Sequence, residues 1–184
     1  MTGYEAEIGG RRLFVCTSEA LFSPRGLDRG TALMLRATPI PAGARVLDLG
    51  CGAGVVGAYA ALCGAEVWMT DIQPEAVEAA AQTMAANHVE ARELVCGDCL
   101  DHVTEAGFDL ILCNPPYHTD FAVAKKMIEK GFNRLKIGGK MVMVVKRELW
   151  YKNKLTSIFG GVRVLREDGY SVLTAERRTA KYAK

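Results

Sequence analysis

The sequence of 184 residues has no long hydrophobic run. No stretch approaches the roughly 18 apolar residues that a membrane-spanning helix needs. The first residues, MTGYEAEIGGRR, lack the charged-then-apolar pattern of a secretory signal, and Thr2 excludes N-myristoylation. These absences predict a cytoplasmic chain without a membrane partner.

The sequence also lacks internal repeats, low-complexity segments and long linkers, so we expect a single domain over residues 1–184. Apolar residues make up 49% of the chain, which is enough for a sizeable core. Within this domain we expect a hairpin extension over residues 1–20 and an α/β core over residues 21–184.

The six cysteines are scattered, and a metal site is not indicated. Cys96 and Cys99 form a single CxxC, whereas a structural zinc site needs a second pair of ligands at a suitable spacing. Without a secretory signal, a disulfide framework is not expected either. We therefore predict no bound metal.

Negative charge dominates the first two thirds of the chain and positive charge the last third. Residues 1–124 hold 7 Lys/Arg and 16 Asp/Glu, a net of −9, whereas residues 125–184 hold 16 and 5, a net of +11. Charge alone favours a solvated face over a phosphate-binding one. If RNA does bind, the candidates for its phosphate path are Lys125, Lys126, Lys146, Arg147, Lys152, Lys154, Arg177 and Arg178.

Strand-like and helical patterns alternate through the middle of the chain. Buried-strand runs cover residues 45–50, 66–71, 92–98, 108–114 and 138–146, and helical patterns cover 55–63, 74–88, 120–135 and 150–159. The helix over 120–135 is expected to be capped by Thr119 or Asp120. Such alternation predicts a parallel sheet with helices on both faces.

Both ends of the chain instead predict hairpins. Asp168-Gly169 separates two strand-like runs near the C-terminus, and Gly9-Gly10 separates two near the N-terminus. We therefore predict an α/β fold with a seven-stranded, mostly parallel sheet, an antiparallel C-terminal hairpin strand and a small N-terminal β-hairpin. The carboxyl ends of the parallel strands should converge on one crevice.

The first strand-to-helix turn, DLGCGAG at residues 48–54, indicates a nucleoside-containing ligand. Residues 52–57 match the dinucleotide pattern GxGxxG, but Asp48 would repel the phosphates of a dinucleotide. S-adenosylmethionine carries a sulfonium and an ammonium and no phosphate, so it is the favoured ligand. The expected donor-binding residues are Asp48, Gly50, Cys51, Gly52, Gly54, Asp71, Ile72, Asp98, Cys99 and Asn114. In this set Asp71 is assigned to the ribose hydroxyls and Asp98 to the adenine amine.

The stretch NPPY at residues 114–117 indicates an amine clamp. The Asn114 side-chain oxygen and the Pro115 carbonyl are two acceptors that Pro115 and Pro116 hold rigidly, and together they could bind both hydrogens of an –NH₂ group. Tyr117 offers a flat face for a planar base. These four residues are the predicted catalytic set.

With these motifs, the chain resembles the class I S-adenosylmethionine-dependent methyltransferases of the "methyltransferase small" domain family. LFSPRGLDRGTALML at residues 21–35 further resembles a segment of the 16S ribosomal RNA guanine-N2 methyltransferase C group, and similarity continues in NRLKIGG, VVK and GYSVL. The resemblance implies a Rossmann-like fold and places Phe22, Ser23 and Asp28 near the methionine end of the donor. Larger members carry an extra N-terminal domain, and this chain resembles the single-domain members.

The resemblance also implies the target. Tyr117-His118 is similar to the Phe-His pair of the guanine-N2 enzymes, which favours guanine N2 of ribosomal RNA, with His118 as an orienting residue. NPPY also occurs in adenine-N6 and protein glutamine-N5 methyltransferases, so these remain alternatives. A donor-binding RNA or assembly factor without activity is a further alternative. The expected partner is RNA or a small-subunit particle, and the expected state is a monomer or weak dimer.

Overall fold

A computed structural model gives the arrangement of residues 2–21, 23, 25–116 and 121–182. The strands are β1 (Thr2–Ile8), β2 (Arg11–Thr17), β3 (Arg45–Leu49), β4 (Glu66–Asp71), β5 (Glu93–Cys96), β6 (Phe108–Cys113), β7 (Leu135–Val145), β8 (Arg163–Glu167) and β9 (Tyr170–Glu176). The helices are α1 (Arg29–Ala37), α2 (Val55–Leu62), α3 (Pro74–Ala86), α4 (Phe121–Arg134) and α5 (Glu148–Phe159).

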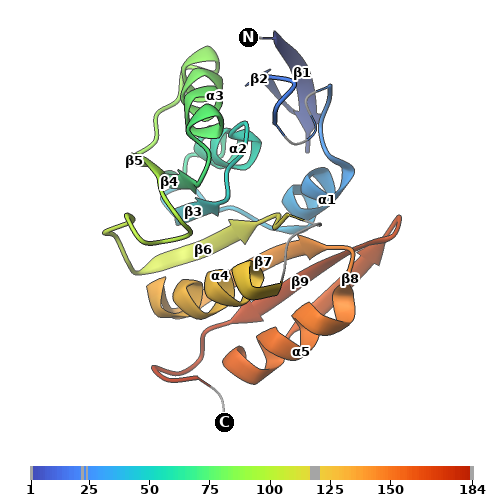
Figure 1. Cartoon of the computed structure of the whole chain (residues 1–184), viewed down its shortest axis with the longest axis vertical. Coiled ribbons are helices and arrows are strands. Elements are labelled where there is room, and N and C mark those ends of the chain that lie inside the picture. Colours follow the sequence, from blue (N-terminus) through green and yellow to red (C-terminus); the bar gives the residue numbers. More distant parts are fainter. Residues whose placement is uncertain (1, 22, 24, 117–120, 183–184) are drawn as a thin grey trace.

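Seven strands form one sheet in the order β5-β4-β3-β6-β7-β9-β8 (Figure 1). The five strands from β5 to β7 are mutually parallel, and β9 pairs antiparallel with both β7 and β8. The predicted parallel core and antiparallel C-terminal hairpin strand are therefore confirmed. The strand order reverses at β3 and β6, so the main ligand crevice should lie beyond their carboxyl ends.

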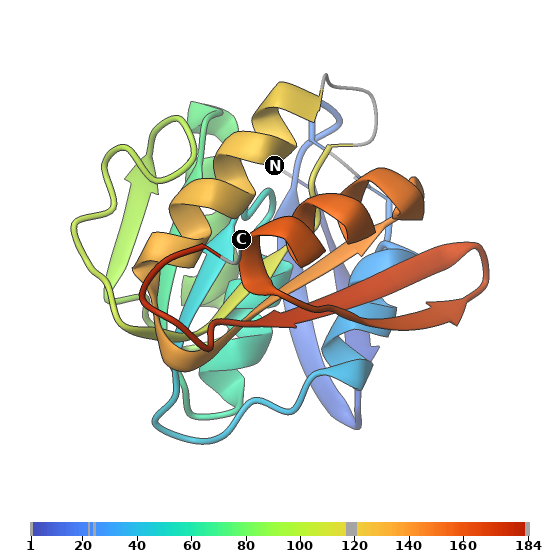
Figure 2. The ribbon, with the colours of Figure 1, turned by 90° about the horizontal axis from the view of Figure 1, so that it is seen from below.

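Two hydrophobic clusters cover opposite faces of this sheet. One contains buried side chains of α1, α2, α3 and the β1–β2 hairpin, and the other contains those of α4 and α5. Figure 2 shows α4 and α5 together on one side of the strands and α1 on the other. The central strand β3 contributes Val46 to the first cluster and Leu47 to the second, as expected for a strand that is buried on both faces.

The N-terminal hairpin forms its own two-stranded sheet, as predicted. Side chains from α3 and its C-terminus bind the free edge of β2. Asn87 accepts a hydrogen bond from the Phe14 backbone N–H at 2.8 Å and donates to the Phe14 carbonyl at 2.7 Å, and Thr83 accepts from the Cys16 N–H at 2.9 Å. These contacts satisfy an edge that would otherwise be open to another strand.

The structure adds two features that the hydrophobic pattern did not indicate. Helix α1 follows Asp28, whose carboxylate caps it by accepting from the Thr31 N–H at 2.7 Å. Strand β7 begins at Leu135 rather than at residue 138, and continues through Gly139, where a side chain would meet the Phe108 carbonyl oxygen at 2.6 Å. The proposed caps of α4, Thr119 and Asp120, lie outside the described residues.

Candidate functional site

A cleft of about 520 Å³ opens at the carboxyl ends of β3, β4 and β6, where the strand ends were expected to converge. Its volume falls in the range of small-molecule sites. The predicted residues that line it are Ser23, Asp28, Asp48, Gly50, Cys51, Gly52, Asp71, Ile72, Asp98, Cys99, Asn114, Pro115 and Pro116. Tyr117, His118 and Phe22 lie outside the described residues.

Glycines shape the loop between β3 and α2. Gly50, Gly52 and Gly54 have φ values of 77°, 50° and 80°, a left-handed conformation that residues with a side chain rarely adopt. At Gly52 an added Cβ would meet no atom within 4 Å, so its cleft side is open. At Gly54 it would lie 2.9 Å from the Ala80 Cα, so Gly54 allows α2 and α3 to pack closely. Its role here is structural, outside the cleft lining.

Asp48 lies beneath this loop and is only 2% exposed. Its carboxylate accepts a hydrogen bond from the Gly57 N–H of α2 at 2.8 Å. Burial raises the pKa of Asp48 to about 7, the Gly57 hydrogen bond opposes that rise, and the nearby charge of Asp71 adds to it. The site therefore holds a buried carboxyl group whose ionised form a cationic ligand would stabilise.

Asp71 fixes the loop while retaining free hydrogen-bonding capacity. One of its oxygens accepts from the Gly52 N–H at 2.8 Å and the other from the Gln73 N–H at 3.0 Å. An ionised carboxylate has about four lone-pair sites, so each oxygen can accept a further hydrogen bond. Two adjacent hydroxyl groups are suitable donors for such a pair of acceptors.

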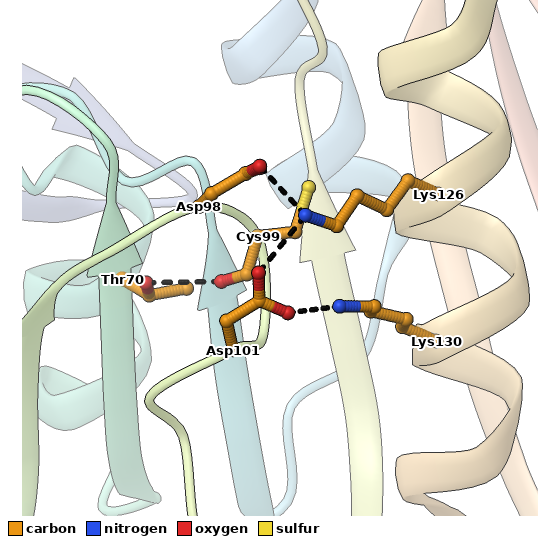
Figure 3. Close-up of polar contacts among 6 residues, drawn as sticks. All are labelled: Thr70, Asp98, Cys99, Asp101, Lys126 and Lys130. Atoms are coloured by element: carbon orange, nitrogen blue, oxygen red, sulfur yellow. Dashed lines mark hydrogen bonds and ion pairs between the residues drawn. The ribbon is translucent and has the colours of Figure 1, made fainter.

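Asp98 is held by helix α4 (Figure 3). Lys126 donates to the Asp98 carboxylate at 2.6 Å and to that of Asp101 at 3.0 Å, and Lys130 also pairs with Asp101. The hydrogen bond from Lys126 holds the pKa of Asp98 below its usual value. Lys126 is one of the candidates for a phosphate path; the structure pairs it with Asp98, the residue assigned to the adenine amine.

Asn114 follows β6 and is oriented by the segment before β3. Its side-chain nitrogen donates to the Asp28 carboxylate at 3.0 Å and to the Thr31 hydroxyl at 2.9 Å. Because a carboxylate cannot donate, the amide nitrogen and not the oxygen must face Asp28. The sequence patterns singled out Asp28 and Asn114 but gave no sign that they touch, and they missed Thr31.

The opposite end of this amide is an unsatisfied acceptor. Among the described residues, the Asn114 side-chain oxygen and one oxygen of Glu93 are the buried side-chain polar atoms without a hydrogen-bond partner. A buried acceptor without a partner costs about 1–3 kcal/mol, so such atoms call for an explanation. Asn114 lines the cleft, and a bound donor group would satisfy its oxygen.

Two cleft residues other than glycine adopt the left-handed conformation. Ser23 has φ 54°, with its hydroxyl donating to the Gly26 carbonyl at 2.6 Å, and Cys99 has φ 55°. Such conformations cost on the order of 1–3 kcal/mol and tend to cluster at functional sites. Their position on the cleft agrees with their prediction as site residues.

The described part of the chain contains neither a group of metal ligands nor a candidate membrane span. No three His, Cys, Asp or Glu side chains in this part of the chain are grouped so that they could hold a metal ion. No helix there combines the length and the apolar composition needed to cross a bilayer.

Comparison with known proteins then identifies the family. The sequence profile of the methyltransferase small domain matches residues 12–174, which is most of the chain. The chain belongs to the methyltransferase small domain family. The Rossmann-like methyltransferase fold implied by the resemblance is thereby confirmed.

Relatives of this methyltransferase small domain are named as ribosomal RNA methyltransferases. It is 37% identical over 163 residues to the ribosomal RNA small subunit methyltransferase C of Cronobacter sakazakii, covering 85% of this chain and 47% of that protein. It is 37% identical over 172 residues to the ribosomal RNA large subunit methyltransferase G of Streptomyces avermitilis, covering 89% of this chain and 45% of that protein. The chain thus spans about half the length of these relatives.

A solved structure supports the same grouping. The T. thermophilus 16S rRNA N2 methyltransferase, solved in complex with AdoMet and guanosine, matches with a TM-score of 0.89 at 31% identity. The match covers 96% of this chain and 50% of that protein.

Proposed function

We propose that this chain transfers the methyl group of S-adenosylmethionine to the exocyclic N2 amine of a guanine in ribosomal RNA. The observation that carries the proposal is the buried, unsatisfied oxygen of Asn114 at the cleft. An amine hydrogen is the partner that this acceptor lacks. The names of the relatives support the choice of RNA, and the guanosine in the T. thermophilus structure supports the choice of guanine.

The charge of the cleft fits a cationic donor. The described lining residues include four aspartates (Asp28, Asp48, Asp71 and Asp98) and neither lysine nor arginine. Asp98 is paired with Lys126, but the other three carboxyl groups favour the sulfonium and ammonium of S-adenosylmethionine and would repel the two phosphates of a dinucleotide. Asp71 retains acceptor capacity for the ribose hydroxyls and Asp98 for the adenine amine, while Gly50 and Gly52 let the loop backbone approach the donor closely.

When bound, the donor supplies a methyl group on a positively charged sulfur. The base nitrogen would form the new N–C bond as the S–C bond of the donor breaks, and the donor sulfur would keep the electron pair of the broken bond. The nitrogen would then lose a proton to water. Asn114 accepts a hydrogen bond from this amine and stabilises the positive charge that develops on it. Pro115 and Pro116 hold Asn114 rigidly in the turn, so catalysis depends on positioning and on preorganised electrostatics. Tyr117 is proposed to stack on the base.

Methyl transfer from tritiated S-adenosylmethionine tests the proposal. The substrates are total RNA, 30S particles and protein extract from cells that lack the gene, and the labelled nucleosides are identified after nuclease digestion. We expect the label in N2-methylguanosine. Label in N6-methyladenosine would move the target to adenine, and label in protein would contradict an RNA substrate.

The Asn114→Ala variant tests the role of the amide. We expect it to abolish turnover and to leave the affinity for S-adenosylmethionine nearly unchanged, because the side chain that binds the amine is removed and the loop at residues 48–54 is not. Calorimetry measures the donor affinity separately. Full turnover in Asn114→Ala would contradict the amine clamp, and an inactive wild-type chain that binds the donor would indicate a binding factor instead.

A further inference from the structure

The positive charge of the C-terminal third is largely taken up by local partners. Lys154 pairs with Glu129 at 2.6 Å, and Arg166 donates to Glu148 at 2.6 Å. Arg177 donates to the carbonyl of Leu135 and to three other backbone carbonyls, and Arg178 lies 3.9 Å from Glu176. These four cations therefore already have contacts within the domain.

Two further cations stand at the edge of the sheet that carries the cleft. Lys146 and Arg147 follow β7 directly, and both are exposed. In the parallel pairing of β6 and β7, Cys113 lies opposite Met143, so Asn114 is level with Val144. Lys146 comes two residues later, directly after β7 ends. The two cations therefore follow β7 at the same edge of the sheet as the amine clamp.

Aromatic and apolar side chains accompany these cations. The Arg147 guanidinium lies 5.5 Å from the centre of the Phe121 ring, which stacks on Trp150 at 4.3 Å and 13°. The Lys146 amine lies 5.0 Å from the centre of the Tyr170 ring. Leu149, two residues after Arg147, is 73% exposed. We call Phe121, Lys146, Arg147, Leu149, Trp150 and Tyr170 the basic rim.

We propose that the basic rim binds the single-stranded RNA that flanks the target base. Lys146 and Arg147 contact its phosphates, and Leu149 and Trp150 pack against a neighbouring base, the combination by which proteins hold single strands. The direction follows from charge, because the side of the cleft at the end of β4, away from β7, carries Asp71, which would repel phosphates. This inference rests on the proposed function and adds the path of the substrate.

The test measures binding of fluorescein-labelled single-stranded RNA of about 12 nucleotides, a length that a single-domain site can cover. The variant is Lys146→Ala/Arg147→Ala. We expect its affinity to fall at least about tenfold at physiological salt, and the slope of log affinity against log salt to become shallower by about 1.4, since each lost single-strand phosphate contact removes about 0.7. Affinity for S-adenosylmethionine should not change.

Arg163→Ala is the control for loss of positive charge away from the cleft. Arg163 is exposed and begins β8, which runs in the same direction as β7, so it lies at the edge of the sheet opposite the cleft. The Arg163→Ala variant loses one positive charge and should keep wild-type RNA affinity. Leu149→Ala should weaken binding and leave the salt slope unchanged, because it removes apolar contact and no charge.

The outcomes separate this inference from the proposed function. If the wild-type chain methylates RNA and the double variant binds RNA as tightly as Arg163→Ala does, the basic rim is wrong and the function stands. If the wild-type chain neither binds RNA nor transfers a methyl group to it, both are overturned. If the double variant loses RNA binding and keeps donor binding, both gain support.

Discussion

The Asn114 amide nitrogen and the Asp28 carboxylate lie 3.0 Å apart, although 86 residues separate them in the chain. Asp28 thus has two tasks: it caps α1 and it turns the Asn114 oxygen away from α1. A hydrogen bond to a carboxylate also polarises the amide, which makes its oxygen a stronger acceptor for an amine that is gaining positive charge.

Asp28→Asn should therefore lower turnover while α1 stays folded, since asparagine caps helices about as well as aspartate does. Replacing a charge-assisted hydrogen bond by a neutral one should cost about 1.4 kcal/mol, a tenfold fall in kcat. Single-turnover rates at saturating donor measure this fall, and a wild-type rate in Asp28→Asn would contradict the polarising role of Asp28.

Asp48 should make the stability of the fold dependent on pH. Burial raises the pKa of this carboxyl group from 3.8 to about 7, so between these values the folded chain holds a proton that the unfolded chain has released. Below pH 3.8 the Asp48 carboxyl group is protonated in both states and does not destabilise the fold. As the pH rises from 3.8 to about 7, the free energy of unfolding falls, because only the unfolded chain gains from releasing this proton. The loss amounts to roughly 4 kcal/mol. Urea unfolding at pH 5, 6 and 8 gives the free energy of unfolding as a function of pH. Asp48→Asn should remove this part of the pH dependence, and the same pH dependence in both proteins would contradict the prediction.

Much of the site follows from sequence because strand ends are local features. The run at residues 45–50 predicts a buried strand, and once its neighbours are parallel, Asp48, Asp71 and Asp98 must face one edge of the sheet. The left-handed glycines of the loop are likewise encoded locally, in the order GCGAG. Fold and cleft therefore depend on patterns that a single sequence contains.

The contacts that orient the site are not local. Thr31 and Asn114 are 83 residues apart, and Lys126 and Asp98 are 28 apart, so neither pairing leaves a periodic pattern. The sequence pattern does not predict helix α1, because the helix has only nine residues and begins with Arg29, Gly30 and Thr31, of which the last two are weak helix formers. Its position is determined by the Asp28 cap and by packing, which only the folded chain provides.

Substituting two glycines of the loop between β3 and α2 should affect stability and donor binding differently. Gly54→Ala should lower the free energy of unfolding by about 3 kcal/mol, because a left-handed alanine is strained and its Cβ would overlap the Ala80 Cα. Gly52→Ala should cost only about 1 kcal/mol, since no atom lies within 4 Å of its Cβ, but it should weaken donor binding from the cleft side. Urea unfolding and donor calorimetry on both variants check this, and equal stability losses would contradict the assignment of Gly54 to helix packing.

Lys126 should matter to the donor more than its neighbour Lys130 does. Lys126 bridges Asp98 and Asp101, whereas the described contact of Lys130 is with Asp101 alone, which lies outside the cleft lining (Figure 3). Lys126→Met should let the pKa of Asp98 rise and, by leaving two neighbouring carboxylates unbridged, release Asp98 from its place at the cleft. Affinity for S-adenosylmethionine should then fall, while Lys130→Met, with the same loss of charge, should bind the donor as the wild type does.

Calorimetry gives both affinities, and NMR titration of the Asp98 carboxyl gives its pKa. An unchanged affinity in Lys126→Met, together with a raised pKa, would show that the ion pair forms but does not position Asp98 for the donor.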